Sequence, residues 1–588
     1  MNNIGDSIIS SLGFTSEENF EAVKRGISGL QSHKLGNLPE PFIASMINRE
    51  RLQDTFLDMR LKKNPKSHIS YTPFEQAIIL SIHEANRQLN IDLSAPNVLF
   101  IISTTKGNVH LIDENEKGFD KKQLYLWYSA RLAAQFFGNQ NIPVVVSNAC
   151  ISGGCAQITA QRALQSGKYD YAVVAGADLL CRFIVSGFQS FKALSPTPCK
   201  PFDKEHCGLN LGEAAATMIY CNEQILMNNE QLATHHKGRL LAGAIRNDAC
   251  HISAPSRTGE GSFIALKTVL QNISNPISQI AFINAHGTAT PYNDDMEMNA
   301  ILRSGLEKIP VNSLKSYFGH TLGAAGLVET IISLQAANEG LILKTLGTEN
   351  NEQITMNNEQ YSIPICKENT KTDKPLFIKM LSGFGGTNAA LLFEKSQIPS
   401  LTSHISNPTS QIPNLHTTHH CKITEPFTDL YRKMKIDYPK FFKMDRMSKA
   451  GFLAAEILLK DIENKKDTAI LCFTHTSSLN TDKSYQKTIQ KADDFFPSPS
   501  IFVYTLPNIV AGEIAIRHGC KAETSCYVIE KNDAKMMMEI VNQTFAYTPD
   551  LQQALVGYID DDEQCEATMM LIERKGNKLF SADFLFNI

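Results

Sequence analysis

The sequence contains no run of about 18 uninterrupted apolar residues, the length that a membrane-spanning helix needs. It has no C-x-x-C pair, and its closest cysteines, Cys150 and Cys155, lie five positions apart, so the 13 cysteines show no metal-like pairing. The first residues include the acidic Asp6 and no basic cluster before an apolar run, which argues against a secretory signal. These absences predict no membrane span and a cytoplasmic protein whose thiols stay reduced.

The sequence also lacks an excess of charge of one sign. It has 56 basic and 60 acidic side chains, and the formal net charge of -4 gives no global reason to bind nucleic acid or anionic lipid. Apolar residues make up 43% of the chain and charged residues 20%, which is the balance of a globular protein. Because single cores stop growing at about 250 to 300 residues, a chain of 588 residues should form at least two units.

Short apolar runs alternate with amphipathic segments along the first two thirds of the chain. Residues 97–105 and 171–177 read as buried strands, and the segment between them after Cys150 has helical spacing. This rhythm predicts a parallel sheet covered by helices. Since it restarts near residue 240, we predict two similar α/β halves, 1–239 and 240–395.

The composition changes at residues 396–425, where Ser, Thr, Pro, Asn and His replace apolar residues. We predict a linker there and a further folded unit at 426–588. Four histidines fall in the predicted linker: His404, His416, His419 and His420. Because no helix or strand is expected to fix them, we predict no metal site.

The strongest local signal surrounds Cys150, where an apolar strand runs into the cysteine and then into a helix. A tight bend of this kind exposes the side chain at its apex and needs small neighbours, here Ser152, Gly153 and Gly154. A helix N-terminus favours a thiolate and offers free amides for an oxyanion, so we expect a nucleophile with a lowered pKa. The alternative is a structural cysteine, which is the usual role of a buried thiol.

Three further segments could act with this cysteine. His286 ends an apolar strand, Lys315 precedes His320 by five residues, and Phe384 lies in a glycine-rich turn. Each is weak alone, because a histidine at a strand end is as often structural as catalytic. The glycine turn could hold phosphate, but it lacks the lysine of a P-loop and leads into an apolar strand.

Taken together, these segments resemble the motifs of elongating β-ketoacyl-[acyl-carrier-protein] synthases, in the same order. The matching residues are Cys150 in NAC, His286 in HGTAT, Lys315 and His320 in K-S-x-x-G-H-T-x-G-A-A-G, and Phe384 in GFGGTN. Residues 201–213 are similar to a further signature, and the resemblance covers roughly residues 1–395. It implies the thiolase fold, with duplicated α/β halves in α-β-α-β-α layers. His320 argues against thiolases and chain-initiating synthases, which use another third residue.

The resemblance implies a decarboxylative condensation without cofactor or metal. Cys150 would accept an acyl chain from an acyl carrier protein, with the amides of Cys150 and Phe384 holding the oxyanion. His286 and His320 would stabilise the enolate formed from malonyl on a carrier protein. Lys315 would order the site with Glu329, Asp294 would support it, and the Phe384 ring would act as a gate. Two alternatives stay open: a non-catalytic chain-length or scaffold partner of another ketosynthase, and a fatty acid or a polyene-type polyketide pathway.

The chain departs from the family pattern at both ends. Its first residues start almost at the expected polar turn, so we expect one edge strand to be short or absent. Two C-terminal segments echo the first half, and their alignment places Ile509 or Val510, neither a nucleophile, where the cysteine would be. The unit at 426–588 therefore resembles a truncated, silent, chain-length-factor-like ketosynthase half. It could take the partner's place in a pseudo-dimer or cap a homodimer.

Overall fold

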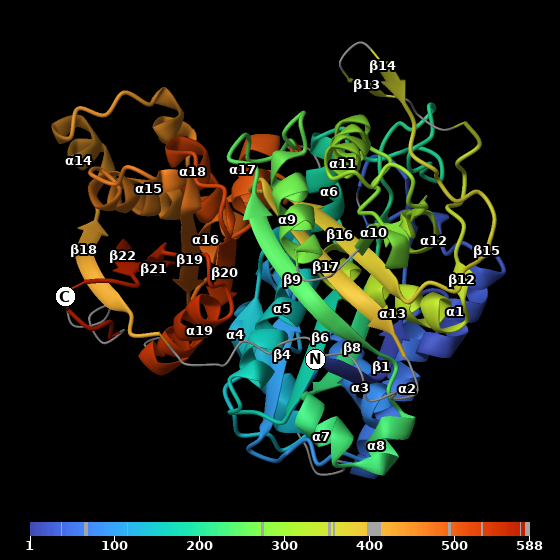
Figure 1. Ribbon diagram of the computed structural model, residues 1–588. Coiled ribbons are helices and arrows are strands. Elements are labelled where there is room, and N and C mark those ends of the chain that lie inside the picture. Colours follow the sequence, from blue (N-terminus) through green and yellow to red (C-terminus); the bar gives the residue numbers. More distant parts are fainter. Residues whose placement is uncertain are drawn as a thin grey trace.

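The computed structural model places one continuous body and a C-terminal unit side by side (Figure 1). It describes residues 1–36, 38–63, 69–113, 116–271, 276–350, 354–356, 359–396, 413–491, 495–530, 533–576 and 578–581. We call residues 1–396 the body and residues 413–581 the C-terminal unit.

A sheet of 15 strands runs through the whole molecule, in the order β11-β10-β16-β17-β9-β1-β8-β6-β4-β5-β20-β19-β21-β22-β18. The first half contributes β1 (Asn2–Ile9), β4 (Val98–Ser103), β5 (Val144–Val146), β6 (Tyr171–Asp178) and β8 (Ala214–Cys221). The second half contributes β9 (Gly238–Asn247), β10 (Ile280–Asn284), β11 (Val311–Asn312), β16 (Leu376–Gly383) and β17 (Thr387–Lys395). The C-terminal unit contributes β18 (His416–Thr424), β19 (Thr468–Thr474), β20 (Thr524–Val528), β21 (Gln553–Asp561) and β22 (Cys565–Glu573).

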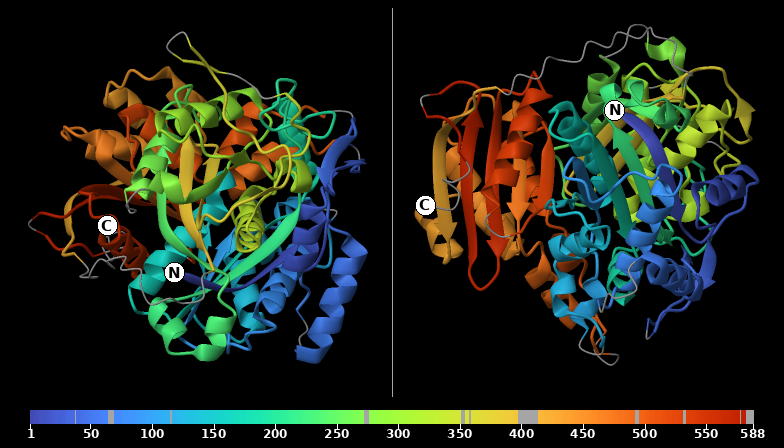
Figure 2. Two further views of the ribbon diagram at one scale, coloured as in Figure 1. Left: turned by 45° about the vertical axis from the view of Figure 1, so that its right-hand side comes forward. Right: turned by 90° about the horizontal axis from the view of Figure 1, so that it is seen from below.

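The body is layered, because two helices lie between the strands of its first half and the strands of its second half. Helix α5 (Ser152–Gln165) contacts β4 and β6 on one side and β9 and β17 on the other, and α13 (Ala325–Asn338) lies between β8 and β16. Helices α3 (Pro73–Asn86) and α4 (Leu126–Phe136) cover the outside of the first half. Helices α9 (Glu260–Leu270) and α11 (Pro291–Arg303) cover the second. The predicted α-β-α-β-α arrangement of duplicated halves is confirmed (Figure 2).

The expectation of a short or absent first strand is wrong. Strand β1 has eight buried residues and pairs along its length with β8, in the middle of the sheet. Its polar side chains make it hard to recognise in the sequence, and three of them are hydrogen-bonded: Asn2 donates to Glu223 (3.2 Å), Asn3 donates to Asp6 (3.1 Å), and Lys237 donates to Asp6 (2.9 Å). A buried polar group costs little when it is hydrogen-bonded, so a polar sequence can form a central strand.

The C-terminal unit extends the sheet through an antiparallel pairing of β20 with β5, in which Tyr527 faces Val146. The predicted linker ends too late, because residues 416–424 form the edge strand β18; residues 397–412 lie outside the described residues. An edge strand needs few apolar side chains, and here Thr417 and Ile423 are buried while His419 and His420 are exposed. The remaining elements of the unit are α14 (Phe427–Lys433), α15 (Arg446–Leu458), α16 (Leu479–Lys487), α17 (Pro499–Tyr504), α18 (Ile509–His518) and α19 (Ala534–Ala546).

The strand order on the two sides of the β5–β20 pairing is mirrored. Outward from this seam, β5-β4-β6-β8-β1 corresponds to β20-β19-β21-β22-β18. Helices α15 and α18 cover the face that α3 and α4 cover in the first half, and α19 shares the core of α5 on the opposite face. The C-terminal unit is thus built like the first half alone.

This correspondence corrects the predicted position of the missing nucleophile. Ile509 and Val510 begin α18, which precedes β20 as α4 precedes β5, and the segment aligned with β5 forms the helix α17. The true counterpart of the cysteine bend follows β20. Its sequence from residue 529 to 535, IEKNDAK, contains no cysteine, serine or threonine.

Smaller elements complete the body. They are α1 (Ser16–Lys24), β2 (Gln31–His33), β3 (Phe42–Ser45), α2 (Arg49–Lys63), α6 (Arg182–Ser190), β7 (Leu211–Gly212), α7 (Glu223–Met227), α8 (Glu230–Thr234), α10 (Pro276–Gln279), α12 (Lys315–Phe318), β12 (Leu341–Ile342), β13 (Ile354–Met356), β14 (Glu359–Tyr361) and β15 (Thr370–Lys371). In the part of the chain that the structure describes, no helix has both the length and the apolar character needed to cross a bilayer.

Candidate active site

Cys150 lies at the bend between β5 and α5, as the sequence predicts. Ala149 adopts a left-handed conformation with φ of 48°, which turns the chain sharply before the cysteine. The small residues behind the bend are required by packing, since a Cβ on Gly153 would lie 3.0 Å from the carbonyl oxygen of Gly323. Cys150 itself is only partly buried, whereas Cys155 on the same helix is fully buried. The bend therefore presents one thiol.

The thiol is not an anion at rest, contrary to the expectation from its place near a helix N-terminus. Burial raises the pKa of Cys150 to about 12, against the opposing effect of the Lys315 charge. The backbone amides of Cys150 and Phe384 point at the sulfur and favour its charged form. Desolvation outweighs these effects, so the sulfur must lose its proton as it reacts.

His286 and His320 face each other, and the charge of Lys315 acts on both rings and on Cys150. Their ring centroids lie 5.0 Å apart at an interplanar angle of 88°, and both residues are buried. Burial lowers the pKa of both histidines well below 6.5, and the charge of Lys315 lowers it further. Both rings are therefore neutral near pH 7, which is the state in which a histidine donates one hydrogen bond without carrying charge.

Glu297 fixes the backbone at His286. Its carboxylate accepts from the amides of His286 and Gly287, each at 2.6 Å. Asp294, one turn earlier on α11, accepts from the amide of Phe202 at 2.8 Å. Burial raises the pKa of Asp294, and the nearby Glu297 raises it further. Asp294 thus supports the wall behind the histidines.

A buried charge cluster lies behind the histidine pair. The ammonium groups of Lys315 and Lys379 each bond one oxygen of Glu329, and all three side chains are at most 2% exposed. Lys379 also donates to the carbonyl oxygen of Ala285 at 3.1 Å, just before His286. Burial lowers the pKa of Lys379 to about 8, and the Lys315 charge adds to this effect. The family resemblance implies the pairing of Lys315 with Glu329, which is present, but Lys379 was not among the predicted site residues.

An apolar pocket opens at the thiol and is lined from both parts of the chain. Cys150, Phe384 and Phe188 come from the body, while Phe502 and Leu506 come from the C-terminal unit. The Phe384 ring contacts Phe191 at a centroid distance of 5.7 Å. An apolar pocket beside a nucleophile suits an alkyl or polyene chain.

The pocket wall also holds a buried ion pair that joins the two parts of the chain. Lys106 of the body donates to Asp482 of α16 at 2.7 Å, to Ser478 at 3.2 Å and to the carbonyl oxygen of Thr505. Lys106 and Asp482 are 4% and 10% exposed at their side chains. No local pattern predicts this contact, because Lys106 and Asp482 lie 376 positions apart.

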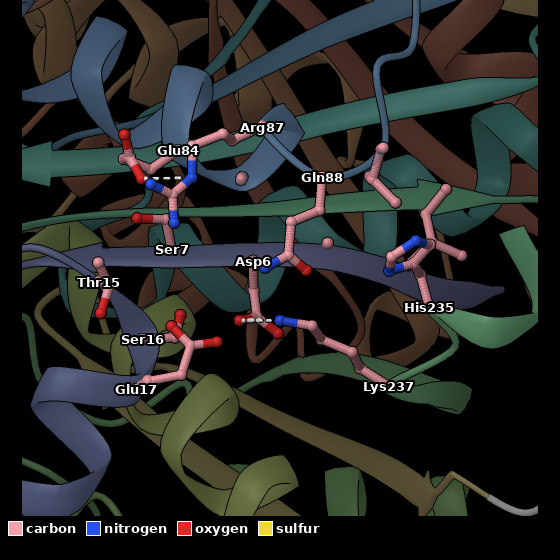
Figure 3. A pocket seen from close by; sticks show the side chains of 14 residues that line it. Asp6, Ser7, Thr15, Ser16, Glu17, Glu84, Arg87, Gln88, His235 and Lys237 are labelled. Atoms are coloured by element: carbon pink, nitrogen blue, oxygen red, sulfur yellow. Dashed lines mark hydrogen bonds and ion pairs between the residues drawn. The ribbon is translucent and has the colours of Figure 1, made fainter.

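A second pocket lies apart from Cys150, around β1 and the end of α3 (Figure 3). Four of its charged side chains form ion pairs, Asp6 with Lys237 at 2.9 Å and Glu84 with Arg87 at 3.3 Å. None of the residues proposed for the chemistry lines it. Among the described residues, no group of three or more His, Cys, Asp or Glu side chains could hold a metal ion.

Family models match most of the body. Residues 56–224 match the model "Beta-ketoacyl synthase, N-terminal domain", and residues 238–349 match "Beta-ketoacyl synthase, C-terminal domain". These parts of the chain are thus similar to the β-ketoacyl synthase family. The matched ranges contain Cys150, His286, Lys315, His320 and Glu329.

Curated 3-oxoacyl-[acyl-carrier-protein] synthases are similar to less than half of the chain. The 3-oxoacyl-[acyl-carrier-protein] synthase 2 of Vibrio cholerae is 29% identical over 266 residues, which cover 43% of this chain and 62% of that protein. The enzyme of the same name from Rhizobium meliloti is 30% identical over 261 residues, covering 42% of this chain and 60% of that protein. The chain thus spans about three fifths of the length of these relatives.

Solved ketosynthase structures share the fold, including the C-terminal unit. The structure titled "PfaC Keto synthase-Chain length factor" superposes with a TM-score of 0.76 at 14% identity, covering 97% of this chain and 78% of that chain. The ketosynthase ApeO in complex with its chain length factor ApeC, from Xenorhabdus doucetiae, gives a TM-score of 0.55 at 22% identity, covering 67% of this chain and 98% of that chain. The fold of a ketosynthase with a chain length factor therefore extends over nearly all of this chain.

Proposed function

We propose that this protein catalyses the decarboxylative condensation of malonyl on an acyl carrier protein with an acyl chain held on Cys150. The observations that carry this proposal are a partly exposed thiol at an apolar pocket and two buried, neutral histidines that face each other, with the charge of Lys315 acting on all three. We infer catalytic roles for Cys150, His286 and His320, a supporting role for Lys315 with Glu329 and for Asp294, and an oxyanion and gating role for Phe384.

In the first step, the sulfur of Cys150 attacks the acyl thioester on the carrier protein. The amides of Cys150 and Phe384 receive the developing oxyanion, because both point at the sulfur. The tetrahedral intermediate collapses, the carbon–sulfur bond to the carrier breaks, and the proton of the thiol leaves with the carrier thiol. The acyl chain then lies in the apolar pocket.

In the second step, malonyl on a carrier protein loses carbon dioxide, and its thioester oxygen gains negative charge. Neutral His286 and His320 donate to this oxygen, and one such donor typically contributes about 2.7 to 4 kcal/mol. The enolate carbon attacks the acyl-cysteine carbonyl. The Cys150–acyl bond breaks, the sulfur takes up a proton, and a 3-oxoacyl chain two carbons longer stays on the carrier.

The C-terminal unit acts as a built-in partner in this proposal. It pairs with β5 at the sheet edge and adds Phe502 and Leu506 to the pocket, so the body has the surroundings of a dimer within one chain. We favour this pseudo-dimer over a homodimer formed through β5, because that edge is occupied. We divide the chain at about residues 239 and 396, and we propose a cytoplasmic location, in keeping with 13 cysteines that form no disulfide.

The alternative, a non-catalytic scaffold partner, has less support because the thiol and both histidines are present. Mass analysis of the protein after incubation with an acyl carrier protein panel, followed by malonyl carrier protein, tests the choice. A condensing enzyme gains the acyl mass and then releases a 3-oxoacyl carrier. His286→Ala should gain the acyl mass but release little product. A scaffold partner would gain no acyl mass from any donor.

A further inference from the structure

The C-terminal unit touches the turn that carries Phe384. The side-chain amide nitrogen of Asn508 donates to the carbonyl oxygen of Phe384 at 2.8 Å. Asn508 is 2% exposed and directly precedes α18. A residue of the catalytically silent unit therefore bonds the turn whose amide points at the Cys150 sulfur.

The two segments approach each other closely at two glycines. A Cβ on Gly512, in the first turn of α18, would lie 2.8 Å from the backbone of Gly385. Gly385 has φ of 92°, and a Cβ there would lie 2.7 Å from the side-chain amide nitrogen of Asn508. Both glycines therefore favour this close approach.

By bonding Phe384, Asn508 gives up the hydrogen bond that would cap its own helix. An asparagine at the start of a helix usually bonds the helix amides, but here the side chain makes no such cap. Its amide oxygen is buried without a hydrogen-bond partner among the described residues. A buried unpaired acceptor destabilises the fold, and such departures from local preference are expected at functional positions.

The other side of the turn is held by the body. The amide of Gly385 donates to the carbonyl oxygen of Ile252 at 2.6 Å, and Asn247 donates to the carbonyl oxygen of Gly385 at 2.8 Å. A Cβ on Gly383 would lie 3.2 Å from the amide nitrogen of Cys150. The backbone of the turn at Phe384 is thus held between the cysteine bend on one side and the N-terminus of α18 on the other.

We propose that Asn508 is a positioning residue for the reaction, which fixes the Phe384 amide toward the oxyanion formed at Cys150. The inference rests on the proposed function and gives the silent unit a role in the chemistry itself, beyond covering a sheet edge and lining a pocket. Because oxyanion donors act only when correctly aimed, loosening the turn slows the steps at the Cys150 carbonyl. Malonyl decarboxylation, which depends on the two histidines, is affected less.

The test measures the two half-reactions separately in the full chain. Asn508→Asp keeps the size of the side chain but removes its donor, and Asn508→Leu removes both polar atoms. Each should slow acylation of Cys150 by an acyl carrier protein about tenfold or more, while malonyl carrier protein decarboxylation stays within about twofold of wild type. Asn480→Leu is the matched control, since Asn480 also donates to a backbone carbonyl within the unit, that of Asp561 at 2.6 Å.

Two results would overturn the inference. One is acylation at the wild-type rate in Asn508→Asp, and the other is an equal loss in both half-reactions, which marks a purely structural role. Thermal unfolding of each variant identifies a loss of folding. The proposed function fails in a different way, because the wild-type protein itself would then form no acyl adduct.

Discussion

The first half of the body and the C-terminal unit share one backbone plan, but only the first half carries a cysteine at the bend after its seam strand. In the first half, Asp178 accepts from Thr104 at 2.8 Å, and the turn after β4 reaches Gly107 with φ of 49°. In the C-terminal unit, Asp560 accepts from Thr474 at 3.0 Å, and the equivalent Ser477 has φ of 54°. The C-terminal unit thus has the same turn, including the residue with positive φ, although this residue is Ser477 and not a glycine.

The two regions differ at the bend after the seam strand. After β5 the chain reads NACISGG, with a thiol at the apex and small residues behind it, whereas after β20 it reads IEKNDAK. The sheet pairing needs only the backbone of β5 and β20, so selection for the seam does not preserve a nucleophile. The C-terminal unit therefore keeps the strands that form the seam but not the cysteine at the bend that follows.

The largest effect should follow from removing the one reactive thiol. Cys150→Ala should abolish the acyl adduct completely, because the counterpart bend has no replacement. Intact-mass analysis with acyl carrier protein measures this. Cys155→Ala, a buried cysteine on the same helix, is the control and should be acylated like wild type. An adduct that persists in Cys150→Ala would mean that another cysteine is the nucleophile.

A smaller but still large effect is expected at the ion pair between the two regions. Asp482→Ala leaves the buried ammonium of Lys106 without its counter-charge, which typically costs about 3 to 5 kcal/mol. Urea unfolding measures the loss. The pair of changes Lys106→Met with Asp482→Leu should restore most of it, because a buried pair can be replaced by apolar residues. Asp429→Ala, in an exposed pair with Arg432, should change stability by less than about 0.5 kcal/mol.

The sequence was sufficient to predict the apolar strands and the site residues that lie in local motifs. The predicted strands at 97–105 and 171–177 correspond to β4 and β6, and the predicted strand before His286 corresponds to β10. These runs are buried on both faces, so their hydrophobicity is continuous. The motifs around Cys150, His286 and His320 likewise met in space, because each follows the end of a strand or leads into a helix of the central layer.

The sequence was insufficient to predict the strands and site residues whose structure depends on partners far away in the chain. Strand β1 was missed because its polar side chains bond Lys237 and each other, and β18 because an edge strand needs little apolar surface. Lys379 lies within an apolar run, and only its contact with Glu329, 50 positions away, shows that its charge belongs to the site. The sequence alignment that placed Ile509 at the position of the nucleophile matched the start of helix α18 to the cysteine bend. Both segments are apolar and lie near a glycine, and only the strand order distinguishes them.

The next effect concerns the pocket that both regions line. Phe502 contacts Phe188 at a centroid distance of 5.8 Å, and a Cβ on Gly187 would lie 2.2 Å from its ring. Phe502→Ala should therefore open the pocket and favour longer acyl chains, by about 0.8 kcal/mol for each further methylene buried. Competition between acyl carrier proteins of increasing chain length measures the shift. Phe442→Ala, exposed on the same unit, is the control, and an unchanged preference in Phe502→Ala would separate the unit from chain-length selection.

The smallest expected effect is a change in how stability depends on pH, caused by the charge cluster of Lys315, Glu329 and Lys379. This cluster lies in the second half of the body, which has no counterpart in the C-terminal unit. Burial lowers the pKa of Lys379 from 10.5 to about 8, so between these values the unfolded chain holds a proton that the folded chain has released. Stability should therefore rise with pH in this window, by at most about 1.4 kcal/mol per pH unit. Lys379→Met removes this contribution, and denaturant unfolding at several pH values between 7 and 10 measures the difference from wild type. Lys374→Met, whose ammonium donates to the carbonyl oxygen of Ile280 at the other end of β10, should keep the wild-type slope. Equal slopes in Lys379→Met and wild type would mean that Lys379 does not titrate in this range, and that Glu329 holds both lysines charged.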